Sequence, residues 1–179
     1  MMCLCLVFSG CEKKNSGLQQ ALNFRRELLG SSACSFTCHI EAEMDDWVYQ
    51  FSVDCRADDE GILFEVTAPE EISGITASLR NGEAQLEFNG LALDFGTAAQ
   101  GRVSPLTTPS LLCSAWSREY IQCAGADGDA CRVTYLCGYD EDEITVDTWF
   151  VDAIPSYAEI SWDGKRILAV TIADFSLEH

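Results

Sequence analysis

Cysteine and histidine side chains are the first residues of this sequence to consider for nucleophilic catalysis. The chain has ten cysteines but only two histidines, and His179 ends the chain in a segment that resembles the stub of a purification tag. A Cys–His or Ser–His–Asp site needs a histidine beside its nucleophile. His39 alternates with apolar neighbours and is expected on the polar face of a strand, with Cys38 on the opposite face. We therefore interpret His39 as a solvated side chain and expect no catalytic residues.

The spacing of the cysteines argues against a metal site and against a complete set of disulfides. No two cysteines have the CxxC spacing of zinc ribbons or thioredoxin-like redox sites. When Cys3, Cys5 and Cys11 are assigned to the N-terminal segment, an odd number remains, so these cannot all pair within one chain. Most of them occupy apolar positions and are interpreted as small buried hydrophobic residues. The sequence thus predicts no metal and no cofactor.

The N-terminal segment is a short apolar run that ends in a cysteine. Residues 1–7 are followed by Phe8-Ser9-Gly10-Cys11 and then by the polar residues 12–17. This pattern resembles the signal peptide and lipobox of bacterial lipoproteins, in which small residues precede a lipidated cysteine. The resemblance implies a lipid on Cys11, a flexible tether over 12–17, and a location on a cell membrane facing outside the cytoplasm. No stretch of the sequence approaches the roughly 20 apolar residues of a membrane-spanning helix.

The charge of the chain restricts its partners. The sequence has 29 acidic and 11 basic residues, a net charge of −18. Nucleic-acid binding depends on basic patches that release counterions, so we expect no nucleic-acid partner. The acidic segments 127–129 and 140–143 resemble calcium ligands but lack the spacing of an EF-hand, and we interpret them as solvated turns.

Aromatic side chains are the residues of this sequence that could bind a hydrophobic ligand. They recur at the apolar positions of alternating segments, where they could line a concave sheet around a hydrophobic ligand. An ordinary packed core is the alternative interpretation. The candidates for the cavity wall are Trp47, Tyr49, Phe51, Phe64, Phe88, Phe95, Trp116 and Phe150.

The first hairpin is the clearest prediction among the elements that would position these side chains. Apolar residues occupy even positions over 34–44 and odd positions over 47–55. A tight turn at 45–46 would place Ile40 opposite Phe51, so that both apolar sets share one face.

The rest of the chain continues this pattern between two helices. Helical spacing of apolar residues predicts helices over 18–29 and 109–119, and the segment after the second helix is predicted as a loop. Further strands are predicted at 62–66, 72–79, 84–88, 91–95, 131–137, 144–150, 157–162 and 165–174. Strands with one apolar face, close turns and only two helices predict an α+β fold with an antiparallel sheet. We expect a signal segment over 1–11 and a single domain over 18–179.

The order of the elements resembles that of the LolA/LolB-like lipoprotein-carrier superfamily over about residues 18–174. In that superfamily an incomplete antiparallel barrel wraps helices around a hydrophobic cavity. The resemblance therefore implies a curved sheet of about ten strands with two helices packed on its concave face. The stretch Phe64–Ile75 also resembles uncharacterised lipoproteins of Gram-positive bacteria.

These predictions lead to one main hypothesis and two alternatives. The main hypothesis is a lipid-anchored extracytoplasmic protein that binds a lipid or acyl chain in a half-barrel cavity, without catalysis. The first alternative is a surface protein-interaction or sensory module with a solid core, which an exposed apolar patch or an open edge strand would favour. The second is a carboxylate-dependent hydrolase, which would need a cleft that holds two close acids.

Overall fold

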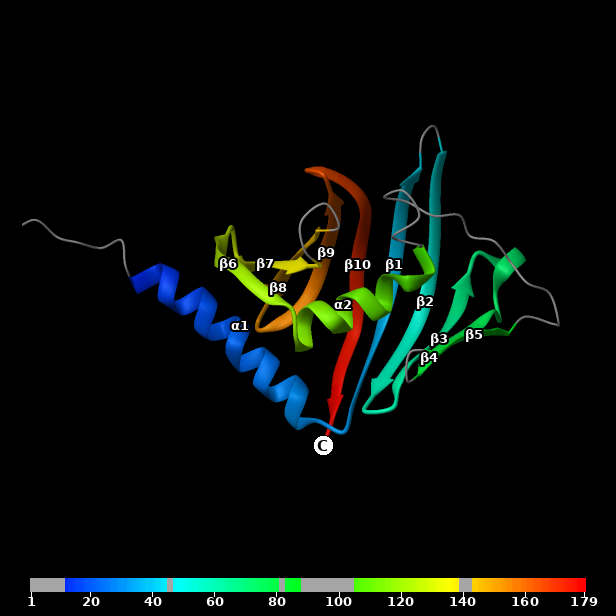
Figure 1. Ribbon diagram of the computed structural model, residues 1–179, viewed down its shortest axis with the longest axis horizontal. Helices are drawn as coiled ribbons and strands as arrows, with labels where there is room; N and C mark the ends of the chain where they lie inside the picture. The colour runs from blue at the N-terminus through cyan, green and yellow to red at the C-terminus, as the bar shows by residue number, and fades with distance from the viewer. Residues whose placement is uncertain (1–11, 45–46, 81–82, 88–104, 139–142) are drawn as a thin grey trace, which may run out of the picture.

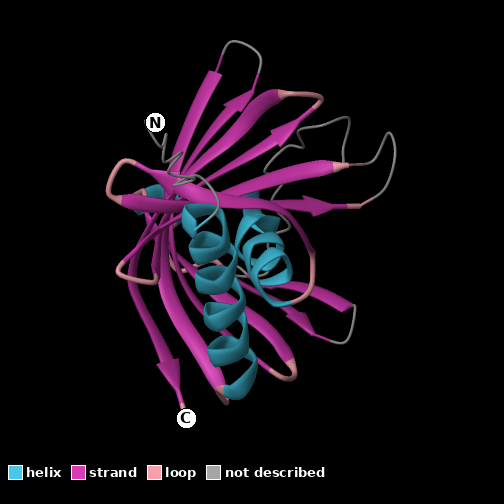
Figure 2. Cartoon of the chain, turned by 90° about the vertical axis from the view of Figure 1, so that its left-hand side faces the viewer, coloured by secondary structure: helices cyan, strands magenta, loops and turns pink. Residues whose placement is uncertain are grey.

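A curved antiparallel sheet of ten strands holds two helices on its concave face (Figure 1; Figure 2). The computed structural model describes residues 12–44, 47–80, 83–87, 105–138 and 143–179. The helices are α1 (Glu12–Gly30) and α2 (Thr108–Ser117), with short 3₁₀ turns η1 (Glu70–Ile72) and η3 (Pro105–Thr107). The strands are β1 (Ala33–Met44), β2 (Trp47–Asp58), β3 (Gly61–Ala68), β4 (Thr76–Arg80), β5 (Glu83–Glu87), β6 (Tyr120–Asp127), β7 (Ala130–Cys137), β8 (Ile144–Val151), β9 (Ile154–Trp162) and β10 (Lys165–Glu178).

The order of the strands makes the sheet an open half-barrel. It runs β5-β4-β3-β2-β1-β10-β9-β8-β7-β6, and each neighbouring pair is antiparallel. The first and last strands of the domain, β1 and β10, meet in the middle, while β5 and β6 lie at the two ends of the order. Within the described ranges no pairing joins β5 to β6, so the barrel stays incomplete. The predicted α+β fold class is confirmed.

The first hairpin has the register that its hydrophobic pattern predicts. Ile40 lies opposite Phe51, and Ala42 lies opposite Tyr49. Ile40, Phe51 and Ala42 are buried on the concave side. Because the side chains of a strand alternate between its two faces, a slip of one residue would expose this whole set.

A bulge in β10 turns the end of the strand toward the helices. Ser35 pairs with Ser176 and Thr37 with Ala173, so β10 contains one residue more than β1 between these two pairs. The extra residue is accommodated where Asp174 adopts a positive φ of 52°. The bulge reverses the alternation of side chains, and Phe175 consequently joins the core.

The two helices fill the middle of the concave face. Ala21 and Phe24 of α1 are buried, as are Leu112, Ala115 and Trp116 of α2. The first helix begins at Glu12, so residues 12–17 are helical, whereas a flexible tether was expected there. Neither described helix has both the length and the apolar character that crossing a membrane would require.

Other differences from the predicted elements lie at the edges of the sheet. Strand β6 occupies a segment predicted as a loop, because its largely exposed side chains show no apolar alternation. The predicted strand at 91–95 lies outside the described residues. Strand β10 extends to Glu178 and pairs Leu177 with Cys34, so the C-terminal segment resembling a tag is part of the sheet.

Candidate functional site

An aromatic cluster fills the centre of the half-barrel. The ring of Trp116 lies 6.0 Å from that of Phe24, 5.5 Å from that of Phe36 and 6.0 Å from that of Phe175. Phe24 also contacts Phe150, with 4.8 Å between the ring centroids. These are edge-to-face distances typical of favourable aromatic pairs. The centre of the concave face is therefore solidly packed.

Polar contacts fix this cluster in one arrangement. The indole Nε1 of Trp116 donates a hydrogen bond to the hydroxyl of Thr148 at 3.1 Å, so its buried N–H is satisfied. Tyr135 is fully buried nearby on β7, and this burial raises the pKa of its phenol. The guanidinium of Arg25 lies 5.8 Å from the centre of the Tyr135 ring.

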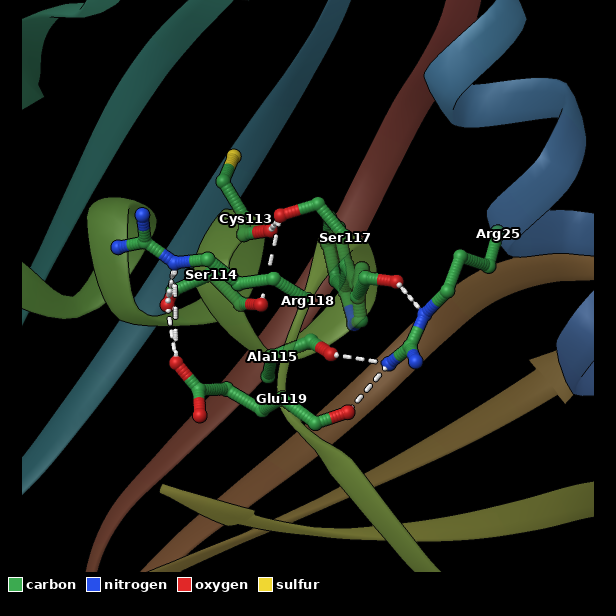
Figure 3. A network of polar contacts seen from close by, with 8 residues as sticks. Arg25, Cys113, Ser114, Ala115, Ser117, Arg118 and Glu119 are labelled. Carbon is green, nitrogen blue, oxygen red and sulfur yellow. Dashed lines mark hydrogen bonds and ion pairs between the residues drawn. The ribbon is translucent and has the colours of Figure 1, made fainter. Parts of the chain in front are cut away.

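Arg25 ties the two helices together. Its Nε donates to the carbonyl of Trp116 at 2.7 Å, and its Nη2 donates to the carbonyls of Ala115 and Glu119 at 3.0 and 2.7 Å (Figure 3). The last carbonyls of a helix have no partner within the helix. Arg25 of α1 thus provides donors to the end of α2 and holds it against the sheet.

Four of the predicted cavity residues belong to this packed interior. Trp116 and Phe150 are fully buried in the aromatic cluster, and Phe51 and Phe64 are buried on β2 and β3. None of the four lines the cavity described below.

The other predicted site residues are dispersed. Tyr49 is 53% exposed near the tip of the first hairpin. Trp47 begins β2, but its side chain is outside the described set. Phe88, Phe95 and the predicted lipidation site Cys11 lie outside the described residues.

A cavity of about 440 Å³ lies at the end of the half-barrel where α1 stops. It is bounded by the last turn of α1, the start of β1, the end of β2 and one side of α2. Its apolar wall consists of Leu28, Leu29, Ala33, Cys34, Ala57 and Cys113. This volume lies within the range of about 300–1,000 Å³ that is usual for small-molecule sites.

The rim of the cavity is polar and acidic. It carries the hydroxyls of Ser31, Ser32 and Ser117, together with Asp58 and Asp59. The Asp58 carboxylate accepts hydrogen bonds from the backbone N–H groups of two residues in the β2–β3 turn, at 3.0 and 3.1 Å. Asp58 is therefore engaged in the turn, which gives it a structural role. An apolar wall with an acidic rim suits a ligand that has an apolar body and a neutral or cationic polar end.

Sequence reasoning missed most of this cavity. Leu28 and Leu29 belong to the helix predicted over 18–29, and Cys34 belongs to the alternating segment 34–44, but neither pattern indicates a cavity. Nothing in the sequence distinguishes Ala57 from other small residues in strands. The cavity lies where the last turn of α1, one side of α2 and the ends of β1 and β2 meet, and these segments lie far apart in the sequence, so only the tertiary structure brings them together.

A second surface hollow lies beside the edge strand β6. This cleft has a volume of about 740 Å³ and includes Leu18 and Leu22 of α1 and Tyr120 of β6. All three side chains are exposed, Tyr120 to 68%. We call these three residues the β6-edge patch.

The outer face of the sheet carries polar pairs. His39 and Ser52 lie opposite each other, with 2.8 Å between the ring Nδ1 and the hydroxyl oxygen. His39 is exposed there, as its position on a polar strand face predicts. Within the described part of the chain, no cluster of three or more His, Cys, Asp or Glu side chains could hold a metal ion.

The comparisons with known proteins concern the fold. No protein-family model and no curated protein matches the sequence. An uncharacterized conserved protein from Thermus thermophilus is similar in structure, with 9% identity and a TM-score of 0.50 over 90% of this chain and 88% of that chain. A LolA superfamily protein from Nitrosomonas europaea is 10% identical, with a TM-score of 0.47 over 91% of this chain and 94% of that one. LprF from Mycobacterium bovis is 12% identical, with a TM-score of 0.40 over 90% and 93%.

Proposed function

We propose that this protein binds a hydrophobic ligand, such as a lipid or acyl chain, in the cavity at the end of its half-barrel, and that it does so without catalysis. The observation that carries the proposal is the apolar cavity of about 440 Å³ between α1, α2 and the ends of β1 and β2. The open half-barrel with two helices agrees with the resemblance to lipoprotein carriers that the order of the elements indicates.

The acidic rim narrows the class of ligand. Asp58 and Asp59 stand beside the cavity in a chain of net charge −18. Like charges near a partly desolvated site cost binding free energy. A neutral or cationic polar end is therefore favoured over the carboxylate of a free fatty acid.

We also propose that Cys11 carries a lipid that holds the protein on a membrane, facing outside the cytoplasm. The sequence Phe8-Ser9-Gly10-Cys11 supports this, and the helix α1 begins immediately after it. Labelling with an alkyne fatty acid in a bacterial host tests the anchor, since Cys11→Ser should abolish incorporation. Equal labelling of both forms would contradict it.

A cavity-filling substitution tests the ligand site. Ala57→Phe places a ring against the apolar wall, and we expect it to weaken binding of the neutral fluorophore N-phenyl-1-naphthylamine at least tenfold. The matched control is Ala173→Phe, because Ala173 lies opposite Thr37 outside the cavity lining. It should change the affinity less than twofold. Equal losses in both variants, or no binding by the unchanged protein, would contradict the proposal.

The β6-edge patch favours a second candidate function, the docking of a protein partner. Strand β6 is the last in the described sheet order, and the exposed β6-edge patch beside it offers an apolar surface to a protein partner. A photo-crosslinking amino acid at Tyr120 should then capture one specific protein in the native host. The same probe at exposed Tyr49 is the control. Identical captures at both positions would refute this function.

A further inference from the structure

Four cysteines gather on the concave face, at the cavity end of the sheet. Cys34 and Cys38 belong to β1, Cys55 to β2 and Cys113 to α2. The thiols lie in two neighbouring pairs, Cys34 with Cys113 and Cys38 with Cys55. All four are free thiols.

The two pairs differ in their relation to the cavity. Cys38 and Cys55 belong to the core cluster and are not part of the cavity lining. Cys34, which is buried, and Cys113, which is half-buried, both line the cavity. Figure 3 shows the Cys113 side chain projecting from α2 away from Arg25. The Cys34–Cys113 pair therefore forms part of the cavity wall, and Cys113 is the more exposed of its two thiols.

The surroundings make the two thiols of this pair unequal. Contact with the Cys113 side chain, together with the Ala57 backbone and the Arg56 guanidinium, lowers the pKa of Cys34 against the opposing effect of burial. The pKa of Cys113 is raised by its contact with Cys34 and by burial. A thiolate is the nucleophile in disulfide exchange, so Cys34 is suited to attack and Cys113 to resolve.

We propose that Cys34 and Cys113 are a redox-active pair that reacts with small disulfides entering the cavity. The Cys34 thiolate attacks one sulfur of the small disulfide, whose S–S bond breaks and releases one thiolate. The Cys113 thiol loses its proton to solvent and attacks the Cys34 sulfur of the mixed disulfide. The second small thiolate leaves, so the small disulfide is reduced to two thiols and the protein gains a Cys34–Cys113 disulfide. This bond links β1 to α2 beside the cavity.

Incubation of the full chain with cystamine, followed by peptide mapping without reduction, tests the pair. The unchanged protein should yield a peptide that joins Cys34 to Cys113. Cys113→Ser should stop at the mixed disulfide and accumulate cysteamine on Cys34. Cys34→Ser should form neither product, and its Cys113 should react at least tenfold more slowly than Cys34 does in Cys113→Ser. The control Cys123→Ser removes an exposed thiol and should leave the Cys34–Cys113 product unchanged.

Three outcomes would overturn the proposal. The first is the absence of cysteamine on Cys34 in a Cys113→Ser protein that unfolds cooperatively. The second is equal reactivity of Cys34 and Cys113 in the single variants. The third is a cross-link that joins Cys38 to Cys55 instead. The reaction is measured without a lipid ligand, so its result is independent of the proposed lipid-binding function.

Discussion

The centre of the half-barrel and its end beside the tip of α1 are built on the same face of the same sheet, yet one is solid and the other is hollow. In the centre, α1 and α2 both lie over the sheet, and Trp116 fills the space between them. At the end, α1 stops at Gly30 just before β1 begins at Ala33, which lies opposite Asp58 at the end of β2. The last turn of α1, one side of α2 and these strand ends line the cavity of about 440 Å³.

The difference shows that stability and binding can be assigned to separate parts of one concave surface. Buried aromatic residues stabilise a fold by packing against one another, and they leave no volume for a ligand. The residues of the cavity wall are smaller or more exposed, and Leu29 is 64% accessible to solvent. Substitutions in the packed centre should therefore mainly lower the free energy of unfolding, whereas substitutions in the cavity wall should mainly weaken ligand binding.

The largest expected effect comes from Trp116→Ala. Removing a fully buried aromatic side chain should lower the free energy of unfolding by about 3–5 kcal/mol. Leu29→Ala on the cavity wall should change it by no more than about 0.5 kcal/mol, yet weaken binding of N-phenyl-1-naphthylamine. Urea unfolding followed by circular dichroism measures the first quantity and fluorescence titration the second. Equal losses of stability would mean that the two regions are not distinct.

A smaller loss of stability is expected from Arg25→Met. This substitution tests whether the contact between α1 and the end of α2 connects the packed centre to the cavity wall. Methionine keeps an apolar stem but supplies no donor to the carbonyls of Ala115, Trp116 and Glu119. Hydrogen bonds from charged groups contribute about 1.5–3 kcal/mol, and we expect a loss of about 2 kcal/mol. Amide hydrogen exchange should accelerate in the last turn of α2, which carries Ser117 of the cavity rim.

The neighbouring residue supplies the control for this substitution. Arg26→Met removes an exposed charge from the same turn of α1 and should alter stability by less than about 0.5 kcal/mol. If amide hydrogen exchange in α2 were unchanged in the Arg25→Met protein, packing alone would position α2 at the cavity wall.

The packed region could be predicted from the sequence far better than the cavity. Period-two alternation determined the face and the register of the first hairpin, including the pairing of Ile40 with Phe51, because one buried face allows one register. Strand β6 was missed because an exposed edge strand has no apolar face to reveal it. Long-range contacts could not be predicted either, since neither Arg25 nor Ala57 has a local sequence pattern that identifies its partner.

The assignment of aromatic residues to a cavity wall shows where prediction from the sequence ends. Apolar alternation identifies inward-facing side chains but not whether another side chain fills the space in front of them. Trp116 and Phe150 face inward as expected, and Phe24 of α1 occupies the space between them. Whether a concave face is solid or hollow depends on helix length and position, which only the tertiary structure provides.

The smallest expected effect compares one residue type in the two regions. Burial raises the pKa of the core thiol Cys137 to about 12, whereas the pKa of Cys34 beside the cavity is lowered. In the unfolded chain Cys137 should titrate near its ordinary value of about 9. Its contribution to stability is therefore complete below pH 9 and is lost as the pH rises from about 9 to about 12.

Urea unfolding between pH 8 and pH 10 measures this loss. The free energy of unfolding should fall with pH in the unchanged protein, because the unfolded thiol ionises while the folded Cys137 remains protonated. The fall should be shallower in Cys137→Ala, whereas Cys123→Ala, which removes an exposed thiol of β6, should keep the original slope. If Cys137→Ala and the unchanged protein had the same slope, the thiol would be hydrated, and the packed region would extend less far along β7 than its burial indicates.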